Sequence, residues 1–136
     1  MITNIASFTI VVRDLNEALE FYVDTLGFER REDLPMGTDD HLAEEKYWAA
    51  VAPRNSQVVF LLQPLSRFEG EERQEREAFV GKASIPVLYV DNCKRAYVDL
   101  SSLGVEFAKV PIDLSYGVEA ICKDPYGNRL VLLERP

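Results

Sequence analysis

The sequence contains few of the residue types that most often carry chemistry in enzymes. Among its 136 residues are one histidine, one tryptophan and two cysteines. The cysteines, Cys93 and Cys122, do not form a Cys-x-x-Cys pair and fall in segments expected to form regular structure. We therefore predict two buried free thiols in a reducing compartment, rather than a disulfide or a redox pair.

Long apolar runs and an excess of basic residues are also missing. No run approaches the roughly 18 apolar residues that cross a membrane, and the N-terminal residues MITNIASF lack the features of an export signal. The net charge of −8 argues against nucleic acid or an anionic membrane as a partner. Without an export signal or a membrane span, we expect a cytoplasmic protein. Its length and an apolar content of 47% suffice for one globular domain with its own core.

The chain repeats itself weakly, about one half-length apart. Residues 9–29, TIVVRDLNEALEFYVDTLGFE, are matched by residues 86–107, PVLYVDNCKRAYVDLSSLGVEF, with a one-residue slip inside the helix. Each copy predicts a strand, a capped amphipathic helix, a glycine stop and a second strand. This repeat indicates one compact domain built from two like modules.

The first module is expected over residues 1–65. Its helix begins after Asp14, with Glu17 completing a capping-box pattern, and ends at Gly27. Its other predicted elements are strands over 5–12 and 28–32, a polar loop over 34–45, and a hairpin of strands 47–52 and 57–62 joined by 53–56.

The second module is expected over residues 83–136, after a charged linker, 66–82, that contains a short helix. Asp91 or Asn92 caps its main helix, which ends at Gly104. Its other predicted elements are strands over 84–90 and 105–109, a loop over 111–116, and a hairpin of strands 118–123 and 129–133 around the turn 124–128.

Two such modules, with DLNEALEFYVDTLGFE in the first and DPYGNRLVLLE in the last hairpin, resemble the vicinal oxygen chelate superfamily. That group includes glyoxalase I, the bleomycin-resistance proteins and the extradiol dioxygenases. The resemblance covers nearly the whole chain and implies an α+β fold, in which a curled eight-stranded mixed sheet surrounds a cavity with helices outside. It also implies a homodimer, but it implies less about chemistry, since one scaffold hosts unrelated activities.

Enzymes of this group hold a divalent metal with His, Glu or Gln side chains from four strands, two in each module. The resemblance puts these positions at Ser7, Val59, Ile85 and Val131, with Phe60 replacing Val59 if the register shifts by one. A hydroxyl and hydrocarbons do not replace imidazole and carboxylate as ligands. We therefore predict no metal and no other cofactor.

Two other residues bear on this prediction. His41 lies in the polar loop, away from these strands in the sequence pattern. Glu119 is the one carboxylate in a strand of the last hairpin, and we expect it to share a face with Leu132 and to point away from the cavity. A shift of one residue in the hairpin would reverse that orientation.

Alternation along the strands defines the rest of the inner face. Across the hairpins we expect Trp48 and Ala50 opposite Leu61 and Val59, and Val118 and Ala120 opposite Leu133 and Val131. The predicted ligand-binding residues are Ser7, Thr9, Trp48, Leu61 and Tyr89. Such an apolar pocket with an indole, a phenol and two hydroxyls suits a planar or aromatic small molecule.

A structural role competes with binding at each position. Filling of the core and binding are equally expected of Trp48, and filling is favoured for Thr9. Ser7 has no histidine within reach to activate it, and Cys93 is expected to pack in the helix stripe rather than act as a thiolate.

The leading hypothesis is a metal-free member of this group that binds or sequesters a small, partly aromatic organic molecule. The alternative is a metal-dependent lyase, isomerase or dioxygenase with a displaced metal site built from Glu119, His41 or loop carboxylates. A third hypothesis is a structural or interaction domain whose inner face is packed shut.

Overall fold

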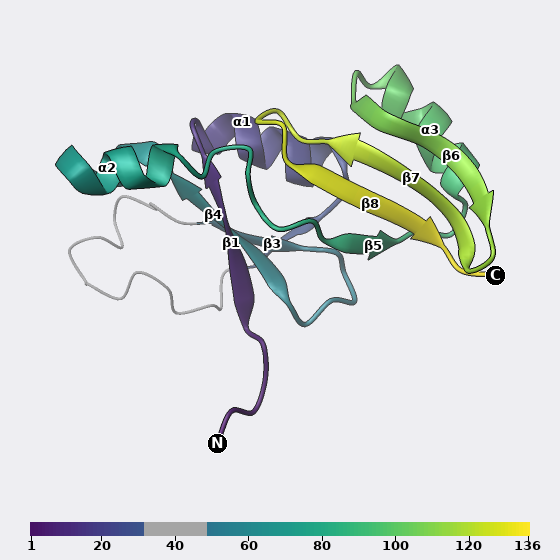
Figure 1. The fold of residues 1–136 in the computed structure, drawn as a ribbon, viewed down its shortest axis with the longest axis horizontal. Helices are drawn as coiled ribbons and strands as arrows, with labels where there is room; N and C mark the ends of the chain where they lie inside the picture. The colour runs from purple at the N-terminus through teal and green to yellow at the C-terminus, as the bar shows by residue number, and fades with distance from the viewer. Residues whose placement is uncertain (32–48) are drawn as a thin grey trace. The chain divides into compact units, whose positions relative to one another are not determined.

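The computed structural model describes residues 1–31 and 49–136, which divide into two compact units, Met1–Val80 and Gly81–Pro136 (Figure 1). In the described residues, eight strands form two four-stranded sheets, in the orders β1-β4-β3-β2 and β5-β8-β7-β6. Within each sheet one pair of strands is parallel and the other pairs are antiparallel. The predicted α+β class with eight strands in mixed sheets is therefore confirmed.

The first unit follows the predicted strand–helix–strand plan. Its elements are β1 (Ser7–Val12), α1 (Leu15–Leu19), η1 (Glu20–Thr25), β2 (Glu29–Arg31), β3 (Ala49–Ala52), β4 (Val59–Pro64), η3 (Leu65–Arg67) and α2 (Gly70–Glu77). The predicted loop over 34–45, His41 and Trp48 lie outside the described residues.

The second unit repeats the plan without the extra helix. Its elements are β5 (Val87–Tyr89), α3 (Cys93–Ser102), β6 (Glu106–Leu114), β7 (Gly117–Lys123) and β8 (Arg129–Glu134). The prediction of a loop over 111–116 is wrong for its first part, because β6 continues through Pro111 to Leu114. An edge strand tolerates proline, and β6 is an edge strand whose pairing with β7 shifts register twice.

Both main helices begin at the predicted caps. The side chain of Asp14 accepts a hydrogen bond from the Glu17 backbone N–H at 3.1 Å, and that of Asn92 accepts one from Arg95 at 3.0 Å. Gly27 and Gly104 adopt φ values of 83° and 91°, which favour glycine at a helix end. The continuation of α1 as a π-helix in η1 was not predicted from the apolar stripe. No helix in the described parts of the chain is both long and apolar enough to cross a membrane.

Each sheet buries one face beneath its own helix. In the first unit, Tyr22 of η1 is fully buried and its ring lies 5.6 Å from that of Phe28 and 5.8 Å from that of Phe60. In the second, α3 lies along one side of β6, β7 and β8 (Figure 1). The buried side chains beneath it are Cys93, Ala120, Cys122, Leu130 and Leu132.

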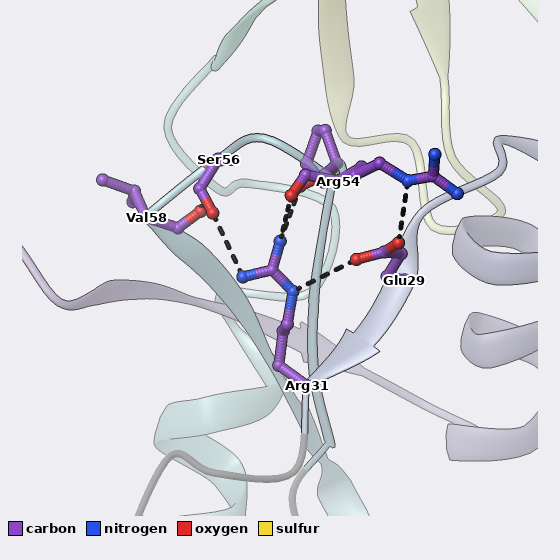
Figure 2. A network of polar contacts seen from close by, with 6 residues as sticks. Glu29, Arg31, Arg54, Ser56 and Val58 are labelled. Carbon is purple, nitrogen blue, oxygen red and sulfur yellow. Dashed lines mark hydrogen bonds and ion pairs between the residues drawn. The ribbon is translucent and has the colours of Figure 1, made fainter.

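The turn between β3 and β4 is held by an arginine from β2 (Figure 2). Arg31 donates hydrogen bonds to the backbone carbonyls of Pro53, Arg54 and Ser56 at 2.8, 3.0 and 3.1 Å. Glu29 pairs with Arg54 at 3.2 Å from the other side of the turn. The side chain of a neighbouring strand therefore fixes this turn.

The equivalent turn between β7 and β8 is held by its own side chains. Asp124 Oδ1 accepts hydrogen bonds from the backbone N–H groups of Tyr126 and Asn128, and Asp124 Oδ2 accepts one from the Asn128 amide at 2.7 Å. The side-chain oxygen Oδ1 of Asn128 accepts a fourth from Ala83 N–H at 2.9 Å. The DPYGN motif thus ties the start of the second unit to its last hairpin, which is a structural role.

Candidate functional site

The second sheet leaves one face uncovered by α3. Val87 and Tyr89 on β5 are 57% and 64% exposed, whereas Leu130 and Leu132 on the covered face of β8 are buried. Side chains alternate between faces along a strand, so the strand register assigns the remaining residues to either face. We call the uncovered surface the open face; its residues are Val87, Tyr89, Lys109, Ile112, Glu119, Ile121, Val131 and Leu133.

These residues form two parallel rows across the sheet. The first row runs Tyr89, Leu133, Glu119, Ile112, and the second runs Val87, Val131, Ile121, Lys109. Neighbouring strands lie about 4.8 Å apart, so each row is roughly 14 Å long between its end strands. The positions on the central strands are aliphatic except for Glu119, with the Tyr89 phenol on one edge strand and Lys109 on the other.

The polar groups of the open face are already arranged in pairs. The Tyr116 hydroxyl donates to Glu119 Oε2 at 2.8 Å, and Lys109 Nζ lies 3.8 Å from Glu119 Oε1. The hydrogen bond to this carboxylate, followed by desolvation and by its charge, raises the pKa of Tyr116 above its ordinary value. At the opposite edge, the guanidinium carbon of Arg135 lies 4.0 Å from the centroid of the Tyr89 ring.

The predicted orientation of Glu119 is wrong. Glu119 pairs with Leu133, and Ile121 with Val131, so Glu119 shares a face with Val131 rather than with Leu132. The cause is the length of the turn, since the pair Lys123–Arg129 encloses five residues and places odd-numbered residues opposite odd-numbered ones. Val118 and Ala120, which were expected on the inner face, pair with Glu134 and Leu132 instead.

The first sheet brings three of the predicted binding residues onto one face. Ser7 pairs with Val59 and Thr9 pairs with Leu61 in the parallel β1–β4 ladder. Ser7 is half-buried, Thr9 is exposed and Leu61 is 2% exposed. On this face Ala50, Ala52, Val59 and Leu61 form a buried apolar cluster. The fourth described residue, Tyr89, belongs to the second unit.

The pairing of the first hairpin also differs from the prediction. Ala50 pairs with Leu61, not with Val59, which is a shift of two residues. A shift of two retains the face, whereas a shift of one reverses it. Ala50 therefore lies on the predicted face.

The positions suggested for a metal can be compared with the observed register. Ser7 and Val59 pair directly, but the partner of Val131 is Val87, two residues beyond Ile85. Val87 is also a hydrocarbon, so the donor set is unchanged. Within residues 1–31 and 49–136, no group of three or more His, Cys, Asp or Glu side chains is arranged to hold a metal ion.

Neither cysteine offers a reactive thiolate. Both are buried, and burial is the main reason why the pKa of each thiol is raised. The pKa of Cys122 reaches about 12. The Cys93 thiol lies 3.7 Å from the Leu132 carbonyl, and its backbone N–H donates to Glu134 at 2.8 Å. The prediction of two buried free cysteines is confirmed.

Sequence reasoning missed three polar residues, namely Lys109 on the open face and Tyr116 and Arg135, which contact Glu119 and Tyr89 of that face. Lys109 belongs to β6, whose register shifts hid the face that it occupies. Tyr116 was assigned to a loop, and Arg135 follows the last strand. Counting the residues of the turn 124–128 is the signal that would have put Glu119, and hence its partners, on this face.

Comparison with known proteins agrees with this fold. Residues 4–132 match the family model of the glyoxalase/bleomycin resistance protein/dioxygenase superfamily. An uncharacterized protein from Shewanella frigidimarina (strain NCIMB 400) is 32% identical over 135 residues, which cover 96% of this chain and 93% of the relative. The chain therefore belongs to the glyoxalase/bleomycin resistance protein/dioxygenase superfamily.

Solved structures share the architecture over nearly their whole length. The crystal structure of UcmS2 matches with a TM-score of 0.77 and 30% identity, covering 98% of both chains. TnmS3, an antibiotic binding protein from Streptomyces sp. CB03234, matches with a TM-score of 0.68 and 23% identity, covering 99% of this chain and 98% of the other. At this identity the likeness to TnmS3 shows the fold alone.

Proposed function

We propose that this protein binds a small, partly aromatic organic molecule without transforming it. The observation that carries the proposal is the open face of the second sheet, where aliphatic side chains lie beside an exposed Tyr89. Exposed apolar residues gathered on one surface mark a binding site more often than singly scattered ones do. TnmS3 shares only the fold with this chain, and it supports no more than the compatibility of that fold with binding.

An aromatic ligand suits this surface better than a sugar or a peptide. Four neighbouring side chains, Val131, Leu133 and Ile121 on the two central strands and Val87 on β5, have no hydrogen-bonding groups, and the strand register arranges them in two rows. A planar ring system gains from covering aliphatic side chains and from contact with the Tyr89 ring. Polyhydroxylated ligands would lose hydrogen bonds to water over the same area.

We also propose the remaining features that the sequence predicts. Ser7, Thr9, Trp48 and Leu61 are proposed binding residues in addition to Tyr89, and the protein is proposed to be a metal-free cytoplasmic homodimer. The module boundaries, residues 1–65 and 83–136 around a linker over 66–82, belong to the same proposal.

The proposal is tested by calorimetric titration with 2-naphthamide, a neutral bicyclic probe. We expect binding by the natural protein, and a loss of roughly three- to tenfold in affinity in Tyr89→Ala, since an aromatic contact contributes about 0.5–1.5 kcal/mol. Phe79→Ala removes a comparably exposed ring outside the open face and is the matched control. Absence of binding by 2-naphthamide and its charged analogues, or an equal loss in both variants, would contradict the proposal.

One observation favours the metal-dependent alternative. Glu119 faces the same side of the sheet as Val131, the position at which the resemblance expects a metal ligand. One carboxylate, already bonded to Tyr116, supplies too few donors by itself. Titration with Ni²⁺, Zn²⁺ and Fe²⁺ separates the two functions. Stoichiometric binding that Glu119→Gln abolishes would favour the enzyme, and its absence would favour the binding protein.

A further inference from the structure

The charge of the open face and its border differs in sign from that of the chain. The whole sequence carries a net charge of −8. On this side of the second sheet lie Lys109, Arg135 and, in the next row towards the turn, the paired residues Lys123 and Arg129. The carboxylates in the paired rows are Glu119 and Glu106, so these rows together with Arg135 carry a surplus of two positive charges.

The two lysines are neutralised within the sheet. Lys109 lies 3.8 Å from Glu119, and Lys123 lies 3.9 Å from Glu106. In the part of the chain that the structure describes, Arg129 and Arg135 have no carboxylate partner. The surplus of positive charge therefore belongs to these two arginines.

Of the two arginines, Arg135 is the one beside the apolar rows. Its guanidinium lies over the Tyr89 ring, and Tyr89 pairs with Leu133, two residues before Arg135. Stacking on a ring orders a planar guanidinium and leaves its N–H donors at the edge, where they bind carboxylates in a bidentate manner. Because Leu133 is the cross-strand neighbour of Tyr89, the aliphatic row begins next to this guanidinium.

Arg129 is the first residue of β8, whereas Arg135 directly follows its last residue. It is six residues from Arg135, which corresponds to roughly 20 Å along a strand. It neighbours Lys123 and the turn, not the aliphatic centre. The two ends of β8 thus carry two exposed arginines of equal charge, of which only Arg135 adjoins the apolar surface.

We propose that the open face selects planar aromatic anions, such as aryl carboxylates, and that Arg135 binds the anionic group. This inference rests on the proposed function and specifies the class of ligand. Glu119 does not oppose an anion at Arg135, because Lys109 and Tyr116 already pair with its carboxylate. Arg135 is accordingly a specificity-determining residue.

Three probes with one ring system test this inference by calorimetry at neutral pH and low salt. They are 2-naphthoate, 2-naphthamide and 2-naphthylmethylammonium, which are anionic, neutral and cationic. We expect the anion to bind roughly tenfold more tightly than the amide, because a charge-assisted hydrogen bond exceeds a neutral one, and the cation to bind most weakly. The advantage of the anion should shrink as the salt concentration rises.

Two variants then assign the effect. Arg135→Gln should reduce the affinity for 2-naphthoate to that of the amide, while Arg129→Gln, which removes the same charge from the same strand, should leave the ratio unchanged. Equal effects in both variants would overturn the role of Arg135. Equal binding of anion and amide, or preference for the cation, would overturn the anion inference while leaving the proposed function standing. If none of the three probes binds, both are overturned.

Discussion

The two sheets share a strand order but use the face away from their helices differently. In the first sheet this face carries the buried cluster Ala50, Ala52, Val59 and Leu61. In the second, Val87 and Tyr89 are more than half exposed, and charged side chains flank the aliphatic rows. Topology therefore does not decide which face of a module is available to a ligand. The observed difference is one of burial: the aliphatic side chains of this face are buried in the first sheet and exposed or half-buried in the second.

We expect the largest effect on stability when equivalent leucines of the two sheets are truncated. Leu61→Ala should lower the free energy of unfolding by about 2–5 kcal/mol, because Leu61 is buried and its removal leaves a cavity. Leu133→Ala removes the same atoms from the half-buried open face and should cost less than half as much. Urea denaturation of both variants checks this, and equal losses would show that the second face is as tightly packed as the first.

The second prediction compares the two hairpin turns, which are held by different kinds of side-chain contact. Asn128→Ala should lower the free energy of unfolding by about 1–3 kcal/mol, since it leaves the buried Asp124 carboxylate and the Ala83 N–H without a hydrogen bond that each now makes. Arg31→Met removes three bonds from the β3–β4 turn, but its side chain is 23% exposed and water replaces part of them. Its loss should be the smaller of the two in the same urea experiment.

A third prediction concerns the covered face of the second sheet. The pKa of Cys122 is raised from its ordinary 9.0 to about 12, mainly by burial. The unfolded chain releases this proton above about pH 9 while the folded protein retains it. The thiol's contribution to stability is therefore present below pH 9 and is lost as the pH rises towards 12, by about 1.4 kcal/mol for each pH unit within that window.

Unfolding measured at pH 8 and pH 10.5 in the natural protein and in Cys122→Ala tests this dependence. The natural protein should lose more stability between the two pH values than the variant does. An identical pH dependence would mean that the folded protein ionises this thiol as readily as the unfolded chain, contrary to its burial.

The smallest effect lies at the open face. The hydrogen bond and charge of Glu119 hold the pKa of Tyr116 above its ordinary value of 10.0. Glu119→Gln should return the Tyr116 pKa towards that value, in a titration followed by NMR of the tyrosine ring. An unchanged pKa would indicate that the two side chains do not meet in solution.

Local signals predicted much of the fold. The caps and stops act through their own backbone and nearest neighbours, so Asp14, Gly27 and Gly104 were readable without a tertiary structure. The second cap was narrowed to Asp91 or Asn92, and the structure shows that it is Asn92. The turn 124–128 was equally readable, since proline and glycine set its backbone.

The site was harder to predict because it depends on register. The polarity pattern along residues 118–121 is too weak to show which side chains face α3. A turn longer or shorter by one residue exchanges the two faces of the strand. The strand β6 passes through Pro111 with two register shifts, which no short-range pattern revealed. Arg135 and Tyr116 could not be recognised from the sequence, because they are defined by contacts with the Tyr89 ring and the Glu119 carboxylate.

Neighbouring residues of β8 offer the most direct test of the central claim, because Val131 and Leu133 lie on the open face while Leu130 and Leu132 lie beneath α3. Titration of methyl-labelled protein with 2-naphthoate should shift the NMR signals of Val87, Val131 and Leu133 and leave those of Leu130 and Leu132 in place. Shifts confined to Leu130 and Leu132, or spread equally over both faces, would contradict binding at the open face.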